Sequence, residues 1–133
     1  MKMKRVYPIL ALLLGSLLAA PGAAQGAEAA KAVHNVVEVR IMNVAFEPAT
    51  LTVRTGTTVR WVNMDPVVHD VTSGTAVTGR RARQVEKTKF PDGRFHSGVF
   101  GKEGSFEWTF TAKGTYRYFC NVHPIMQATV IVE

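Results

Sequence analysis

Ser105-Phe106-Glu107-Trp108-Thr109-Phe110 is the stretch that decides the fold class. Aromatic residues alternate with polar residues along it, and a period of two is typical of a strand with one buried face. The segment 37–42 has the same pattern, with Val37, Val39 and Ile41 at every second position. No helical period of 3.6 residues appears from residue 36 onward. The main part of the chain is therefore predicted to consist of strands.

Further short runs rich in Thr, Val and aromatic residues are expected strands: 51–54, 58–63, 69–72, 115–120 and 128–132. Turn signals separate the runs: Glu47-Pro48, Thr55-Gly56, Asp65-Pro66, Ser73-Gly74, Pro91-Asp92-Gly93 and Lys113-Gly114. This spacing favours an all-β fold, and we predict an antiparallel Greek-key β-sandwich of about seven or eight strands. Residues 74–91 are the least regular part and are predicted to form a loop with a short helix or an extra strand.

The N-terminus has the pattern of a secretory signal peptide. A basic start with Lys2, Lys4 and Arg5 precedes an apolar run of 12 residues, 9–20. As a helix this run would be about 18 Å long, which is too short for a hydrocarbon core of about 30 Å. We predict a signal peptide over 1–27, cleaved between about 24 and 29. A short tail, 28–35, and a single domain, 36–133, would follow. An uncleaved N-terminal anchor is the alternative.

The predicted export, most simply to a bacterial periplasm, changes what the charge means. The chain has 133 residues, 16 of them basic and 10 acidic, and a formal net charge of +6. Cleavage after Ala27 would leave 106 residues, with 13 basic and 10 acidic ones and a net charge of +3. Such a chain has no dense basic stripe, so it is not expected to bind nucleic acid. The mature protein is not expected to span a membrane, and its length excludes a second catalytic domain.

One basic cluster remains in the mature chain: Arg80, Arg81, Arg83, Lys87 and Lys89, opposed only by Glu86. The cluster is compatible with a solvated loop. It is also compatible with a docking patch for an acidic partner, which would speed the encounter and weaken with salt.

Cys120 is the only cysteine, which excludes an internal disulfide and any four-thiolate zinc or iron–sulfur site. It begins the segment Cys120-Asn121-Val122-His123-Pro124-Ile125-Met126, a predicted loop that presents a thiolate, an imidazole and a thioether. These ligands suit copper, and two His, one Cys and a weak axial Met form the blue-copper arrangement. His69 can supply the second imidazole, because the loops of a sandwich gather at its ends.

Several motifs follow one another along the chain: Asn63-x-Asp65 before His69-Asp70-Val71-Thr72-Ser73-Gly74, then Phe95-His96-Ser97-Gly98, Gly104-Ser105-Phe106-x-Trp108-Thr109-Phe110 and Cys120-x-x-His123-Pro124-x-Met126. With them the chain, from about residue 36 to 133, resembles the cupredoxins, the small blue-copper family that includes plastocyanin, pseudoazurin and amicyanin. Its short ligand loop is similar to that of amicyanin.

The resemblance implies long-range electron transfer by a monomeric, non-enzymatic protein. The copper ligands that it implies are His69, Cys120, His123 and Met126. The edge of His123 is then the expected electron port, inside an apolar rim of Val122, Pro124 and Ile125. The expected partners are redox proteins, such as a dehydrogenase donor and a c-type cytochrome or reductase acceptor.

Other interpretations remain open at this stage. Taken singly, the ligand candidates can be a buried core thiol, a turn histidine, a surface histidine and a packed methionine. A copper chaperone, a copper-storage protein or a copper sensor would use the same ligands, and zinc accepts Cys and His. A copper enzyme such as a nitrite reductase needs a further copper centre and more polypeptide, so no enzymatic activity is predicted.

The remaining candidates are expected to have lesser roles. His34 lies in the tail and is not expected to bind metal, whereas His96 is either a surface substitution or part of a second metal site. Trp108, Tyr116 and Tyr118 are expected to fill the core. Asp70 stands where relatives of the family often carry Asn, so the hydrogen bonds between the two ligand loops are a question for the structure.

Overall fold

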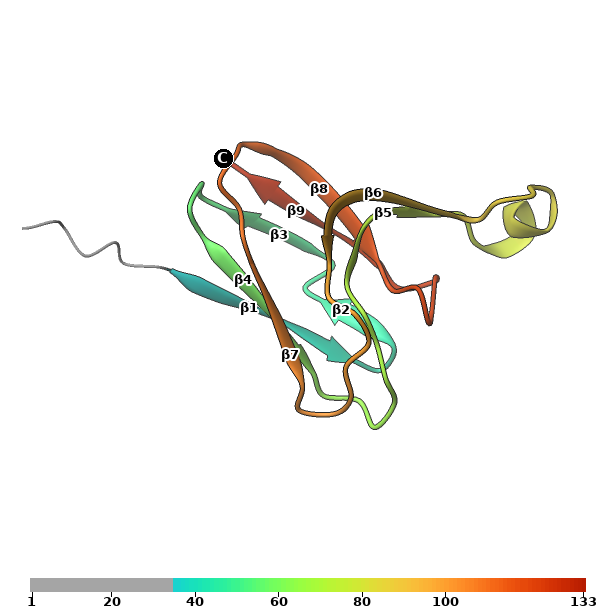
Figure 1. Cartoon of the computed structure of the whole chain (residues 1–133), viewed down its shortest axis with the longest axis horizontal. Helices are drawn as coiled ribbons and strands as arrows, with labels where there is room; N and C mark the ends of the chain where they lie inside the picture. The colour runs from blue at the N-terminus through green and yellow to red at the C-terminus, as the bar shows by residue number, and fades with distance from the viewer. Residues whose placement is uncertain (1–34) are drawn as a thin grey trace, which may run out of the picture. The chain divides into compact units, whose positions relative to one another are not determined.

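The computed structural model describes residues 35–133 (Figure 1). The predicted signal peptide and almost all of the predicted tail lie outside these residues. The described part contains nine strands and one short 3₁₀ helix: β1 (Val36–Met42), β2 (Ala45–Glu47), β3 (Thr50–Val53), β4 (Thr58–Asn63), β5 (Thr72–Ala76), η1 (Gly79–Arg83), β6 (Lys89–His96), β7 (Ser105–Thr109), β8 (Gly114–Phe119) and β9 (Gln127–Val132). Within 35–133, no helix has the length and apolar character to cross a membrane.

The strands form two sheets, which confirms the predicted β-sandwich. One sheet has the order β2-β1-β4-β7 and the other has the order β3-β9-β8-β5-β6. The prediction of purely antiparallel pairing is wrong, because β1 pairs with β4 and β3 pairs with β9 in parallel. Alternation along a strand specifies which face is buried but carries no information about the direction of its neighbour.

Trp61 of β4 lies at the centre of the core. Its side chain is fully buried and packs against the rings of Phe106, at 5.6 Å between centroids, and of Tyr118, at 5.4 Å. Burial raises the pKa of the Tyr118 phenol well above its ordinary value. Trp108 departs from the core prediction: it is 37% exposed, because it belongs to β7 at the edge of its sheet.

Two of the predicted turns are wrong. Ser73-Gly74 lies inside β5 and Pro91-Asp92-Gly93 lies inside β6. Gly74 permits β5 to approach β6 closely, since a Cβ at this position would lie 2.2 Å from the carbonyl oxygen of Phe90. The φ of Gly74 is +126°, and the β5–β6 register shifts beside it. The strand expected over 69–72 starts only at Thr72, and the short helix expected within 74–91 is η1.

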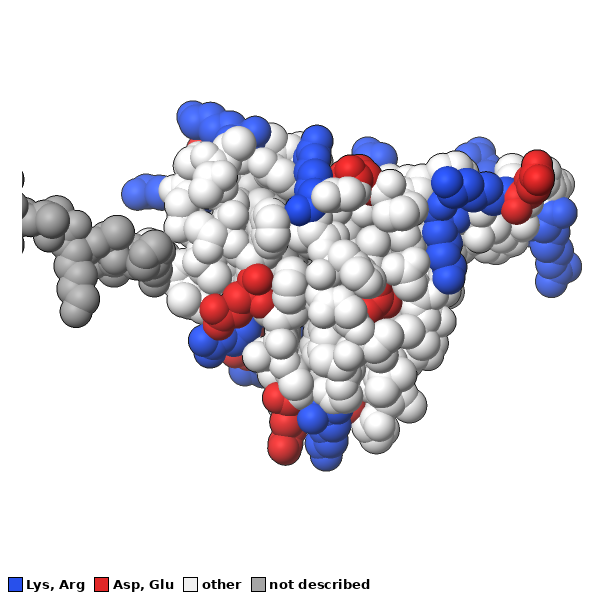
Figure 2. Space-filling model, viewed as in Figure 1, with Lys and Arg blue, Asp and Glu red and all other residues white. Residues whose placement is uncertain are grey.

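Pairing between the strands brings two distant segments together. β5 pairs with β8, with Thr72 opposite Phe119, so the residues before β5 meet the loop after β8. His69 lies on the first of these segments, in an isolated bridge with Phe100, and Cys120 begins the second. The connection between β5 and β6 carries η1 away from the two sheets, together with several Lys and Arg side chains (Figures 1 and 2).

Candidate metal centre

Three of the four predicted ligands converge. The ligating atoms of His69, Cys120 and His123 all lie within 4.8 Å of one another. The Nδ1 atoms of the two histidines are 3.1 Å apart, and the Cys120 Sγ lies 3.9 Å from the Nδ1 of His69. Two nitrogen ligands about 2.0 Å from a metal in a trigonal plane would lie about 3.5 Å apart. The site therefore fits a metal ion bound by one sulfur and two nitrogen atoms.

Asp65 orients the ring of His69. The imidazole is fully buried, and its Nε2 lies 3.0 Å from Asp65 Oδ2, which leaves Nδ1 directed at the Cys120 sulfur. The same carboxylate accepts the backbone N–H groups of Asn43 at 2.8 Å and Val44 at 2.9 Å. Burial alone would raise the pKa of Asp65, but the hydrogen bonds from Val44, Asn43 and His69 hold it below its ordinary value. Such a carboxylate fixes the tautomer of a metal-binding histidine.

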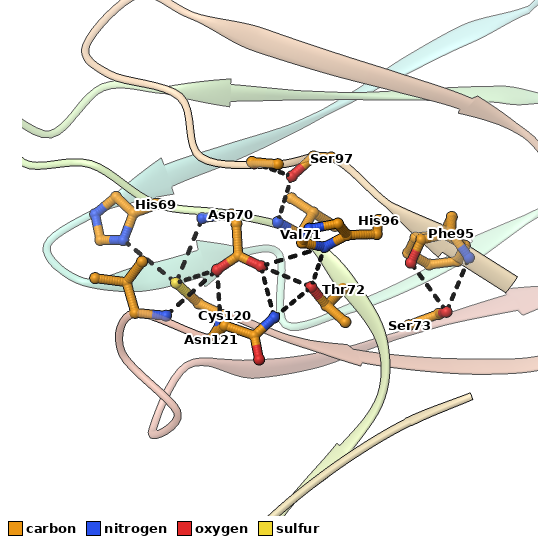
Figure 3. Close-up of polar contacts among 12 residues, drawn as sticks. His69, Asp70, Val71, Thr72, Ser73, Phe95, His96, Ser97, Cys120 and Asn121 are labelled. Carbon is orange, nitrogen blue, oxygen red and sulfur yellow. Dashed lines mark hydrogen bonds and ion pairs between the residues drawn. The ribbon is translucent and has the colours of Figure 1, made fainter. Parts of the chain in front are cut away.

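Asp70 joins the two ligand segments (Figure 3). One of its oxygens accepts the backbone N–H of Asn121 at 2.6 Å and of Val122 at 3.3 Å, and the Cys120 thiol donates to it at 3.3 Å. The other accepts the Thr72 hydroxyl at 2.6 Å and the Asn121 amide at 3.0 Å. Burial would raise the pKa of Asp70, but hydrogen bonds led by those from Thr72 and Asn121 lower it. The loops are thus tied together although Asp replaces the amide common in relatives.

The loop from Cys120 to Met126 is closed by its own hydrogen bonds. The Cys120 backbone N–H donates to the Met126 carbonyl at 3.1 Å, and the Met126 N–H donates to the His123 carbonyl at 2.9 Å. The backbone N–H groups of Asp70 and His123 point at the Cys120 sulfur, at 3.5 and 3.4 Å. Met126 is buried in the core beside this loop. Burial raises the pKa of the Cys120 thiol, so a metal must displace its proton.

The other histidines lie apart from this cluster. The side chain of His96 is 59% exposed, and its Nδ1 contacts Thr72 Oγ1 at 2.7 Å (Figure 3). In the part of the chain that the structure describes, His96 belongs to no second group of metal-binding side chains. His34 lies outside the described residues. The orienting role of Asp65 was not predicted, although its position four residues before His69 was a usable signal.

Exposed apolar side chains adjoin both ligand segments. Val67 and Val68 precede His69, and Val99 precedes its bridge partner Phe100. Val122 and Ile125 extend from the ligand loop itself, and Ile125 is 75% exposed. His123 is only partly buried, whereas His69 and Cys120 are inaccessible. The cluster therefore reaches solvent beside apolar surface.

Comparisons with known proteins agree with this geometry. The family described as copper binding proteins, plastocyanin/azurin family, matches residues 31–133. Amicyanin from Paracoccus denitrificans is 32% identical over 105 residues, which cover 79% of this chain and 71% of the relative. The copper-resistant cuproprotein CopI of Rubrivivax gelatinosus is 31% identical over 111 residues, 78% of this chain and 67% of the relative.

Solved structures give the same result. The oxidized state of an amicyanin mutant aligns with a TM-score of 0.58 at 30% identity, over 74% of this chain and 83% of that one. The reduced Cu(I) form of another amicyanin mutant aligns with a TM-score of 0.57 at 31% identity, over 74% and 82% of the two chains. The chain therefore belongs to the plastocyanin/azurin family of copper-binding proteins: it is a cupredoxin, and its metal is copper.

Proposed function

We propose that this cupredoxin carries single electrons between redox proteins, with copper held by His69, Cys120, His123 and Met126. The observation that carries the proposal is the convergence of two imidazole nitrogens on one buried thiol. Met126 would add the weak axial thioether of a blue-copper site. Its burial, and its backbone hydrogen bonds to Cys120 and His123, support that role.

The hydrogen bonds around the site suit electron transfer. Copper, when bound, supplies a one-electron couple between Cu(II) and Cu(I), whose preferred geometries differ. Asp65 holds the ring of His69, and Asp70 holds the backbone on either side of the Cys120 sulfur. Because these groups limit the movement of the ligands, the arrangement differs little between the two oxidation states, and electron exchange is fast.

His123 is the proposed electron port. It is the partly exposed member of the cluster, and the exposed side chains of Val122 and Ile125 stand beside it in the same loop. An apolar surface of this kind supports small, transient contacts that bury less than about 1,200 Å² in total. The proposed partners are a dehydrogenase donor and a c-type cytochrome or reductase acceptor. No catalysed reaction is assigned to the chain.

The proposed site of action is the periplasm. The basic start, the short apolar run and the A-x-A match at Ala27-Glu28-Ala29 support removal of a signal peptide by cleavage between about residues 24 and 29. The mature protein would then be a monomer with one domain over 36–133. The mass of the protein isolated from a periplasmic extract tests the cleavage, because an uncleaved chain would keep its full 14.6 kDa.

Copper storage, delivery or sensing is the second candidate function, and the similarity to a copper-resistant cuproprotein favours it. Two fully buried ligands, His69 and Cys120, instead favour retention of the metal. Cyclic voltammetry in the presence of a Cu(I) chelator separates the two functions. An electron carrier gives a reversible wave and keeps its copper, whereas a delivery protein loses copper to the chelator in its reduced state.

Metal reconstitution tests the ligands. Addition of Cu(II) to the metal-free protein is expected to give an intense visible band from thiolate-to-copper charge transfer, and Cys120→Ser should abolish it. His96→Gln is the control, since His96 is the described histidine outside the cluster. A Cys120→Ser protein that keeps the band would contradict the ligand assignment. Loss of the band in His96→Gln as well would show that the assay reports folding instead.

A further inference from the structure

The connection between β5 and β6, residues 77–88, forms a basic arm together with Lys89, the first residue of β6. It contains five basic residues against one acidic residue, Glu86. The basic ones are Arg80, Arg81, Arg83, Lys87 and Lys89. Figure 1 shows the arm extending away from the sheets, and Figure 2 shows Lys and Arg side chains gathered along it.

The three arginines of the arm form no ion pair among the described residues that would stabilise the fold. The helix η1 (Gly79–Arg83) contains no buried residue, and its three arginines are exposed. Among the described residues, none of the five basic side chains of the arm forms an ion pair with a carboxylate. Unpaired cations that lie close together repel one another. The three arginines therefore form a concentrated positive charge that no ion pair within residues 35–133 neutralises.

The arm is attached to the ligand loop. The ammonium group of Lys89 donates to the carbonyl oxygen of Asn121 at 2.7 Å, and Asn121 directly follows Cys120. At the base of the arm, the Val77 N–H donates to the Thr88 carbonyl at 2.7 Å. These contacts place the base of the arm, and the charge of Lys89, beside the end of the sandwich at which the ligand cluster reaches solvent.

We propose that the basic arm steers an acidic patch of a redox-partner protein toward the apolar surface around His123; this inference rests on the proposed electron transfer. A cluster of one charge beside a binding surface raises the rate of encounter and sets the orientation of the partner. The arm itself carries an exposed apolar side chain, Val85, and the exposed ring of Phe90 follows it in β6. An apolar centre with a charged rim is the composition of a protein interface, which favours a protein over a lipid surface.

Charge reversal at two positions tests the arm. The arm variant is Arg80→Glu/Arg83→Glu, and the matched control is Arg54→Glu/Lys113→Glu, with the same change of net charge. Lys113 lies just before β8, at the opposite end of that strand from Cys120. Arg54 follows β3, and Val53 of β3 pairs with Val132 of β9, which also pairs with Gly114 at the start of β8. Both control residues therefore lie at the end of the sandwich away from the ligand loop. All variants are loaded with copper and must keep the visible band and the midpoint potential of the unmodified protein.

The measurement is stopped-flow electron transfer from the reduced protein to an oxidised acidic c-type cytochrome, with a basic cytochrome as the charge-reversed probe. Haem absorbance reports the single electron that the cytochrome gains as the protein loses it. At an ionic strength of about 10 mM, where charges act over about 30 Å, the arm variant should react about tenfold more slowly with the acidic cytochrome. The control should change less than about threefold, and high salt should remove both differences.

Four results would contradict the proposed role of the arm or the function on which it rests. Equal effects of the arm and control variants, or a wild-type rate that is no higher with the acidic than with the basic cytochrome, would overturn the proposal. So would loss of binding to anionic phospholipid vesicles in the arm variant without any change in its cytochrome rate, because the partner would then be a membrane. If the unmodified protein reduces neither cytochrome at high salt, the proposed electron-transfer function is contradicted, whatever the role of the arm.

Discussion

At the scale of single residues, two carboxylates organise the proposed copper site. Asp65 acts on one imidazole, through the ring nitrogen that faces away from the cluster. Asp70 acts on the thiol and on the loop that follows it, and its oxygen lies 3.3 Å from the Cys120 sulfur. Asp65 sets the orientation of the His69 ring, whereas Asp70 also places a negative charge beside the Cys120 sulfur.

Replacement of Asp70 by Asn is expected to raise the reduction potential. A nearby negative charge stabilises Cu(II), the more positive state, so its removal favours Cu(I). The expected shift is on the order of 60 mV, a tenfold change in a one-electron equilibrium constant. Protein-film voltammetry measures it, and Asp92→Asn is the control, since Asp92 is an exposed carboxylate paired with Arg94 on β6. An unchanged or lower potential in Asp70→Asn would contradict the electrostatic argument.

At the scale of elements, the close approach of β5 to β6 depends on one glycine. Gly74→Ala is expected to destabilise the copper-free protein by about 2–5 kcal/mol, because the new Cβ meets the Phe90 carbonyl and φ is positive. Gly93→Ala is the control: its φ is +79°, but no atom lies within 4 Å of the added Cβ. It should cost only about 1 kcal/mol. Urea unfolding measures both, and equal losses would show that φ alone, not packing, requires Gly74.

The same strands show what the sequence could predict. Alternation identified β1 and β7, and runs rich in Thr, Val and aromatic residues identified β3, β4, β8 and β9. These patterns missed β2, which has three residues, and β6, most of which is exposed. The spacing of Cys120, His123 and Met126 is local, and so it could be read directly. The contact of Lys89 with Asn121 depends on how separate segments meet, and no local pattern encodes that, whereas Asp65 lies only four residues before His69 and could have been noticed.

At the scale of the whole molecule, the ligands join segments that are far apart in the sequence. His69 and Cys120 are 51 residues apart and meet only because β5 pairs with β8. Asp70 holds these segments together through protein hydrogen bonds of 2.6 to 3.3 Å. The site is therefore assembled by folding of the chain, and the unfolded chain cannot reproduce it.

Copper is consequently expected to stabilise the fold. A ligand at about 100 times its Kd adds about 2.7 kcal/mol, and 1 kcal/mol raises the Tm of a domain of this size by roughly 4–8 °C. Calorimetry should therefore show a rise of roughly 10–20 °C on copper addition. Cys120→Ser should unfold near the copper-free wild type with or without the metal, whereas His96→Gln should respond as the wild type does. An equal rise in Cys120→Ser would place the stabilising copper elsewhere, because a site without its thiolate cannot retain the same preference for the folded state.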